Sequence, residues 1–430
     1  MISIADARSQ EHHRRALSRI PGGVNSPVRA MTAVGREHPL FIERGSGAVI
    51  HDIDGNPFID YVCSWGPLIA GHAHPDVVEA ITERARLGTT FGAPTQLEVE
   101  LAEEVSRRMP SVEMMRMTSS GTEAAMSAVR LARAATGRSK ILKFAGAYHG
   151  HIDGLLAEAG SGLATGAIAS SPGVLQTAAD ETVVVAWNDG EAVAAACAEH
   201  DFAAVIAEPY AANMGLMPPV EGFLELLRNK ADENGALLIF DEVITGFRVA
   251  EGGAQGRTGV EPDLTVLGKI LGGGLPAAAF GGSTALMERI APAGDVYQAG
   301  TLSGNPVATA AGLATLALLD AAAYARLASA TEQLTSGLEL AAAEAGVPVV
   351  VHSVPGLLTV FFTESPPRDY AGARGCDLDA FAAFHGGLLA RGVYVPPSQF
   401  EAWFPSIVHG PEQIEQTIEA AVAAFADIAR

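Results

Sequence analysis

The stretch Leu237-Leu238-Ile239-Phe240-Asp241-Glu242 decides the fold. Four apolar residues without polar alternation are typical of a strand that is buried on both faces, as in a parallel sheet. Two acidic residues follow at once, and a carboxylate in that position needs a cationic partner if it is buried. Because ligands of open α/β sheets bind beyond the carboxyl ends of the strands, the stretch predicts a central strand that ends at a binding site.

The same arrangement recurs on both sides of this stretch. Helical patterns such as 77–86 and 96–109 alternate with short strand-like runs, which are Met115-Arg116-Met117, Ile141-Leu142, Val205-Ile206-Ala207 and Leu264-Thr265-Val266-Leu267. Strands that alternate with helices indicate βαβ crossovers and a mostly parallel sheet with helices on both faces. The predicted fold class is therefore α/β, with a large domain in which helices sandwich the sheet.

The two ends of the chain have a different pattern. Short strand-like runs fill the N-terminal part, and the C-terminal part combines an alanine-rich helix over 321–345, strand-like runs at 347–351 and 357–362, and a final helix over 412–430. We expect residues 66–320 to form the large α/β domain and residues 321–430 a smaller α+β domain. Residues 1–65 are expected to be an N-terminal segment that packs with the small domain.

The composition excludes several classes of protein. The 430 residues carry 28 basic and 49 acidic side chains, a formal net charge of −21, which disfavours a nucleic-acid or anionic-membrane binder. Three widely spaced cysteines give neither a disulfide framework nor a paired metal spacing, so a reducing cytoplasm is expected. We find no signal peptide and no apolar run of about 18 residues, so no membrane span is expected.

Polar side chains follow four of the predicted strands, and we expect them to meet at one edge. They are Ser119-Ser120-Gly121-Thr122, Glu208, Asp241-Glu242 and Lys269. Ser120, Gly121 and Thr122 open a helix, whose N-terminal amides and hydroxyls suit a phosphate. Taken alone, this loop is better explained as an ordinary helix cap with Glu123 in the first turn.

Lys269 is the strongest candidate for an amine with a chemical role. The chain contains only Lys140, Lys143, Lys230 and Lys269, and the last of these is followed by the glycines at 272–274, which allow a bulky ring to approach the backbone. Desolvation lowers the pKa of such an amine and makes it nucleophilic toward a carbonyl. The competing interpretation is a surface lysine beside a flexible loop.

Asp241 would suit the protonated nitrogen of a pyridine ring, and Tyr148-His149 offers a ring that could stack on it. A helix cap or structural ion pair would explain Asp241 as well, and ordinary loop packing the other two residues. The segment 153–182 lacks periodicity, which is typical of a functional lid or of a surface insertion. His72-Ala73-His74 and His149-Gly150-His151 lack a third ligand pattern, so a metal site is disfavoured.

Longer motifs carry a resemblance to a known family. Asp241-Glu242-Val243-Ile244-Thr245-Gly246-Phe247-Arg248 and the run 267–274 resemble the cofactor motif of class III aminotransferases, which are fold-type I pyridoxal-phosphate enzymes. The resemblance extends over nearly the whole chain. The runs 22–30, 297–306 and 397–402 are similar to those of a mutase subgroup, in which the amino group moves within one substrate.

The resemblance implies a set of residues that bind pyridoxal 5'-phosphate or pyridoxamine 5'-phosphate. Lys269 would form a Schiff base with the cofactor and shuttle protons, and Asp241 would pair with the ring nitrogen. Val243 and Tyr148 would contact the two ring faces. The phosphate would be held by Ser120, Gly121 and Thr122, joined by Gly300 and Thr301 of the partner subunit in a homodimer. Glu208, Asn213 and His149 would complete the cofactor pocket.

The resemblance also implies how a small substrate would bind. Ser26 and Arg29 would bind its carboxylate, Trp65 would form a wall of the pocket, and Ser161 would reach it when the 153–182 loop closes. Glu401 would lie near the incoming amine, where many members of the family carry a carboxylate-binding arginine. Small departures, such as Ala277-Ala278-Ala279-Phe280, affect no residue with a chemical role.

The implied reaction is the isomerisation of (S)-4-amino-5-oxopentanoate to 5-aminolevulinate through 4,5-diaminovalerate, a step of tetrapyrrole (porphyrin) biosynthesis. The alternative enzyme is an ω- or β-amino-acid transaminase of class III. A non-catalytic relative would be expected to lack Lys269 or Asp241, and both are present. The sequence leaves open whether a glutamyl-tRNA reductase docks on the protein.

Overall fold

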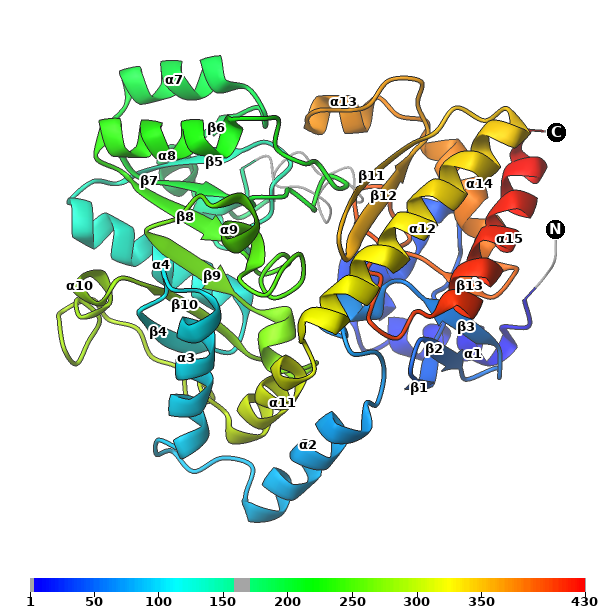
Figure 1. The fold of residues 1–430 in the computed structure, drawn as a ribbon, viewed down its shortest axis with the longest axis horizontal. Coiled ribbons are helices and arrows are strands. Elements are labelled where there is room, and N and C mark those ends of the chain that lie inside the picture. The colour runs from blue at the N-terminus through cyan, green and yellow to red at the C-terminus, as the bar shows by residue number, and fades with distance from the viewer. Residues whose placement is uncertain (1–3, 158–170, 430) are drawn as a thin grey trace.

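The computed structural model describes residues 4–157 and 171–429. Its larger part is built on a seven-stranded sheet with the order β4-β10-β9-β8-β7-β5-β6 (Figure 1). The strands are β4 (Met114–Thr118), β5 (Lys140–Phe144), β6 (Thr182–Val185), β7 (Phe202–Ala207), β8 (Leu237–Asp241), β9 (Leu264–Leu267) and β10 (Ala278–Gly282). The predicted α/β fold with a mostly parallel sheet is confirmed.

Strand β10 is the one antiparallel member among the described strands of this sheet, and it pairs with both β4 and β9. Its sequence, Ala-Ala-Phe-Gly-Gly, lacks the branched residues that predict a strand, so the sequence pattern did not predict it. Small residues are needed here because a Cβ on Gly281 would lie 2.7 Å from the carbonyl oxygen of Met114.

Helices cover both faces of this sheet. Ile206 and Ile239 pack with Leu131 of α4 (Gly121–Thr136) on one face, whereas Val205 and Leu238 pack on the other face with α7 (Gly190–Glu199) and α8 (Phe223–Asn234). Successive strand residues thus enter opposite cores, which is why these strands read as continuous apolar runs. The other helices of this part are α2 (Pro75–Leu87), α3 (Gln96–Arg108), α6 (Gln176–Ala179), α9 (Gly253–Thr258), α10 (Thr284–Met287) and α11 (Pro306–Ala317).

The N-terminal and C-terminal segments share a second core. The strands β1 (Ile42–Ser46), β2 (Val49–Asp52) and β3 (Pro57–Asp60) continue into β13 (Val393–Tyr394), which pairs parallel to β3. One apolar cluster joins side chains from both segments, for example Phe58 and Phe425. The remaining elements here are α1 (Ala7–Leu17), β11 (Val350–Val354), β12 (Leu357–Phe361), α13 (Tyr370–Arg374), α14 (Leu378–Leu389) and α15 (Pro411–Ile428). Both termini lie at this end of the molecule (Figure 1).

The long helix α12 (Ala321–Ala345) follows α11 after a sharp bend. Its first turn is capped by Asp320, whose carboxylate accepts a hydrogen bond from the backbone N–H of Ala323 at 2.7 Å. No single helix of residues 4–157 and 171–429 is long and apolar enough to cross a membrane, although α11 and α12 meet that test when the 79° bend between them is ignored.

A buried histidine in the second core makes stability depend on pH. His385 of α14 is 1% exposed; its Nε2 hydrogen bonds to the carbonyl oxygen of Val395 at 3.2 Å, and its Nδ1 has no partner. Burial lowers the pKa of His385 to about 4. The unfolded chain therefore takes up a proton at this residue at a pH where the folded protein does not.

We predict that His385→Leu makes the free energy of unfolding less sensitive to acid. The lowered pKa means that the wild-type protein loses about 2 kcal/mol through this residue between about pH 7 and about pH 5. Between these two pH values, the free energy of unfolding of the variant should fall by about 2 kcal/mol less than that of the wild type, as measured by urea unfolding. Parallel curves for the two proteins would contradict the assignment.

Candidate active site

A cavity of about 810 Å³ lies at the carboxyl edge of the large sheet. The ends of β4, β5, β7, β8 and β9 all contribute to its wall, and so do the N-terminal segment and the C-terminal part of the chain. Of the residues predicted for a site, those that line the cavity are Ser26, Trp65, Ser120, Gly121, Thr122, Tyr148, Glu208, Asn213, Asp241, Val243, Lys269 and Glu401. The expected convergence of strand ends is therefore present.

Four of the predicted residues do not line this cavity, and the placement of a fifth is not described. His149 lies behind Asp241, to which it is hydrogen bonded. Arg29 is exposed beside Val28, which lines the cavity, and Gly300 and Thr301 are exposed in a loop that does not line it. Ser161 lies outside the described residues. The cofactor and substrate roles suggested for these five residues, and for the twelve that line the cavity, remain predictions.

Lys269 follows β9 directly and presents the amine of the cavity. Its φ of +49° is unusual for a residue with a side chain, and such strain is concentrated at functional positions. Enclosure of the amine lowers the pKa of Lys269, while the nearby carboxylates of Glu401, Glu208 and Asp241 oppose this shift. The result is an amine that loses its proton more readily than an exposed lysine does.

Asp241 presents a buried carboxylate at the end of β8. Its Oδ1 accepts a hydrogen bond from the backbone N–H of Val243 at 3.1 Å, and its Oδ2 lies 2.8 Å from Nδ1 of His149. His149 is 1% exposed, and its Nε2 has no hydrogen-bond partner. The histidine thus orients the carboxylate from behind and leaves Asp241 available to a cationic group in the cavity.

Glu208, at the end of β7, organises the neighbouring loops. Its two carboxylate oxygens accept hydrogen bonds at 2.9 Å from the backbone N–H groups of Tyr148 and Ala212 and from Nδ2 of Asn213. Burial raises the pKa of Glu208 and also that of the Tyr148 phenol. Glu208 therefore fixes the loop on which Tyr148 presents its ring to the cavity.

The N-terminus of α4 provides a place for an anion. Ser120 caps the helix by accepting a hydrogen bond from the N–H of Glu123 at 3.3 Å, and Gly121 and Thr122 follow at the positive end of the helix dipole. The opposing loop approaches closely, because a Cβ on Gly150 would lie 2.6 Å from Cα of Thr122. The backbone N–H groups at this helix start thus suit an anion at the wall of the cavity.

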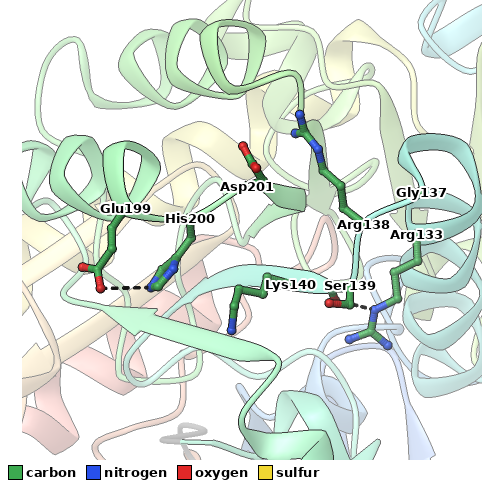
Figure 2. Close-up of a pocket in the computed structure, with 8 residues that line it drawn as sticks. All are labelled: Arg133, Gly137, Arg138, Ser139, Lys140, Glu199, His200 and Asp201. Atoms are coloured by element: carbon green, nitrogen blue, oxygen red, sulfur yellow. Dashed lines mark hydrogen bonds and ion pairs between the residues drawn. The ribbon is translucent and has the colours of Figure 1, made fainter.

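A second pocket lies at the opposite, N-terminal edge of the sheet (Figure 2). Its basic side chains already bind the protein itself. Arg138 donates to the carbonyl oxygens of Phe202 and Asn234, and Lys140 donates to that of Asp180. Figure 2 also shows the ion pair between His200 and Glu199, 3.8 Å apart. This pocket holds none of the predicted site residues.

Comparison with known proteins identifies the family. The sequence matches the family described as Aminotransferase class-III over residues 31–424. The chain belongs to the class III aminotransferase family. A curated relative, the glutamate-1-semialdehyde 2,1-aminomutase of Roseiflexus castenholzii, is 56% identical over 424 residues, which are 98% of each chain.

Solved structures of the family have the same fold. An omega-transaminase from Sphaerobacter thermophilus is 36% identical, with a TM-score of 0.91 over 99% of this chain and 98% of that one. A variant glutamate-1-semialdehyde-aminomutase from Pseudomonas aeruginosa PAO1, in complex with PMP, is 31% identical, with a TM-score of 0.86 over 97% and 94% of the two chains. The fold-type I assignment is thereby confirmed.

The residues present fit a pyridoxal group by their chemistry. The cavity offers an amine for a carbonyl, a buried carboxylate for a pyridinium nitrogen and a helix N-terminus for a phosphate. A Cβ on Gly121 would lie 3.2 Å from Cγ2 of Val243, so the start of α4 packs closely against the residue predicted to contact the ring.

Sequence reasoning missed several residues of the cavity wall. Asn25, Pro67, Leu275, Pro276 and Ala277 line it but carry no chemical signal of their own. Leu275–Ala277 directly follow the glycine run after Lys269, so their position could have been inferred from that motif. Nothing in the spacing of Asn25 and Pro67 relates them to a sheet whose first strand begins at Met114.

We predict that Glu401→Gln shifts the covalent capture of pyridoxal phosphate by the apoprotein to lower pH. Among the neighbouring charges, Glu401 raises the pKa of Lys269 most, so removing its charge should lower that pKa and expose a neutral amine in more acidic solution. The rate of appearance of the visible absorption band, measured against pH, checks this expectation.

Glu412→Gln is the matched control, because Glu412 is exposed on α15. Its capture profile should coincide with that of the wild type. If the pH at which the capture rate of Glu401→Gln falls off in acid is unchanged or higher than in the wild type, Glu401 does not act on the amine.

Proposed function

We propose that the protein is a glutamate-1-semialdehyde 2,1-aminomutase, which isomerises (S)-4-amino-5-oxopentanoate to 5-aminolevulinate via 4,5-diaminovalerate in tetrapyrrole biosynthesis. The observation that carries the proposal is the buried carboxylate of Glu401 in the cavity with Lys269, which suits an incoming ammonium group. The full-length identity of 56% to an aminomutase supports it independently.

The cofactor is pyridoxal 5'-phosphate or its amine form, pyridoxamine 5'-phosphate; when bound, it supplies an electron sink that lets a carbon–nitrogen bond be made or broken. Asp241 holds the proton at the ring nitrogen, aided by His149 from behind. Ser120, Gly121 and Thr122 bind the phosphate. The amine of Lys269, with its lowered pKa, accepts and returns the proton at the reacting carbon.

The substrate fits between the cofactor site and the N-terminal segment. Ser26 lines the cavity, and Arg29 is exposed beside Val28, which also lines it. As the family resemblance implies, the two would bind the substrate carboxylate, which suits the planar guanidinium of Arg29. Trp65 forms a wall, and Glu401 attracts the amine at the other end. A carboxylate at 401 also repels the carboxylate of an ordinary amino-acid donor, which favours transfer within one substrate molecule.

The active unit is proposed to be a cytoplasmic homodimer in which Gly300 and Thr301 of the partner subunit reach the phosphate. Gly300 and Thr301 lie in an exposed loop that does not line the cavity of their own subunit. The cytoplasmic location is supported by the free thiols of Cys63, Cys197 and Cys376. The 153–182 loop with Ser161 would retain the diamine intermediate. Residues 66–320 would hold the cofactor, and 1–65 with 321–430 would form the small domain. A glutamyl-tRNA reductase is a candidate donor of the labile aldehyde.

The alternative function is an ω-transaminase of the same family. It is favoured by one observation, the TM-score of 0.91 with the omega-transaminase from Sphaerobacter thermophilus. That enzyme class requires a second, keto-acid substrate to complete its cycle, whereas the mutase does not.

The assay that separates the two supplies the purified holoenzyme with glutamate-1-semialdehyde, with and without an added keto acid. We expect sustained formation of 5-aminolevulinate in both cases, at the same rate. Turnover that stops after about one equivalent unless a keto acid is added would establish the transaminase instead, and no product at all would exclude the proposed substrate.

A further inference from the structure

Arg248 is a buried cation outside the cavity that the proposed chemistry does not use. It is fully buried, and its guanidinium donates to the carbonyl oxygens of Gly66, Gly356 and Pro405. No carboxylate of residues 4–157 or 171–429 forms an ion pair with it, and its Nε has no partner. Burial lowers the pKa of Arg248 to about 10, which reflects how unfavourable this position is for a charge.

The three carbonyl groups come from distant parts of the chain. Gly66 directly follows the N-terminal segment, Gly356 lies in the turn between β11 and β12, and Pro405 lies in the segment before α15. The guanidinium also lies 5.2 Å from the ring centroid of Phe404. A planar group with several donors can join three such carbonyls at once, which a lysine ammonium on a flexible stem does less well.

The turn that ends at Gly66 is strained. Cys63, Ser64, Trp65 and Gly66 have consecutive φ values of +44°, +57°, +69° and +112°, and three of them carry side chains. Such a run persists only where the surroundings determine it. Its start is held by Oδ1 of Asp60, which accepts hydrogen bonds from the N–H groups of Val62 and Cys63 at 2.8 and 3.1 Å.

The end of this turn lies against the reactive lysine. A Cβ on Gly66 would lie 3.4 Å from Cδ of Lys269 and 2.9 Å from the ring of Phe404, so the backbone is already close to both. Trp65, the residue before it, lines the cavity. The position of one carbonyl group therefore affects both the stem of Lys269 and the indole at the cavity wall.

We propose that Arg248 is a positioning residue of the active site: through the Gly66 carbonyl it holds the left-handed turn Cys63–Gly66 against the stem of Lys269 and fixes Trp65 at the wall of the cavity. This inference rests on the proposed function only in assigning substrate to that wall. The positive charge of Arg248 also lowers the pKa of Lys269, in the direction that favours a neutral amine.

The test compares Arg248→Lys with Arg138→Lys. Arg138 is a matched control because it also binds backbone carbonyls, but at the opposite edge of the sheet. Acrylamide quenching reports mainly on Trp65, since Trp187 and Trp403 are 2% and 1% exposed. Each substitution is therefore made in the wild-type chain and in Trp65→Phe, and the difference gives the quenching of Trp65.

We expect Arg248→Lys to raise the quenching of Trp65 about twofold or more and to raise KM for the semialdehyde by about tenfold with a smaller change in kcat, as loss of ground-state positioning requires. Arg138→Lys should lower thermal stability without either effect. Unchanged quenching in Arg248→Lys, with only a loss of stability like that of the control, would overturn the proposal.

Gly66→Ala decides the matter if Arg248→Lys does not fold. It keeps Arg248 but places a methyl group 2.9 Å from the ring of Phe404 at a positive φ, which forces the turn to shift. It should therefore reproduce the increase in Trp65 quenching; unaltered quenching would overturn the proposal. Because quenching needs no substrate, a holoenzyme that fails to turn over the semialdehyde would contradict the proposed function without touching this result.

Discussion

The structure depends on keeping one primary amine and several carboxylates together in an enclosed cavity. Lys269 sits among Glu208, Asp241 and Glu401, and each of these groups would be unfavourable there without the others. The protein places three of these groups by ending the buried strands β7, β8 and β9 at one edge, and Glu401 reaches the same cavity from the C-terminal part of the chain. The same enclosure that makes the arrangement costly also makes the amine reactive.

Hydrogen bonds from neighbouring groups explain how Asp241 and Glu208 keep their positions beside the amine of Lys269. His149 and the N–H of Val243 hold Asp241, while two backbone N–H groups and Asn213 hold Glu208. Each carboxylate is thus held in place by the hydrogen-bond donors around it. A pyridoxal cofactor would replace the water of the cavity with a ring whose charges complement those of the wall.

The parts of the site near the sheet were predictable from the sequence, because an uninterrupted run of apolar residues followed by a polar residue indicates the end of a buried strand. Asp241, Glu208 and Lys269 were found in this way. Strand β10 was not predicted, because its glycines and alanines are required by close packing and form no periodic pattern of apolar residues. The roles of Arg29, Thr301 and Ser161 came from the resemblance alone, and geometry within one subunit does not test them.

The contribution of the N-terminal segment was expected from the family resemblance alone, and no local sequence pattern predicts it. Ser26 and Trp65 reach the cavity because β3 pairs with β13, a contact between residues more than three hundred positions apart. A local sequence pattern does not predict pairing between strands so far apart in the chain. The buried guanidinium of Arg248, which joins three remote carbonyl groups, depends on the same long-range packing and reads in the sequence as an ordinary charged residue.

The most direct test of the central claim is reduction of the holoprotein with borohydride, followed by peptide mapping. The chain contains only four lysines, so the other three serve as internal controls. Lys143 is buried among backbone carbonyls, Lys140 binds the carbonyl of Asp180, and Lys230 pairs with Glu233. The account predicts one pyridoxyl group per chain, on Lys269; a label on any other lysine, or none, would contradict it.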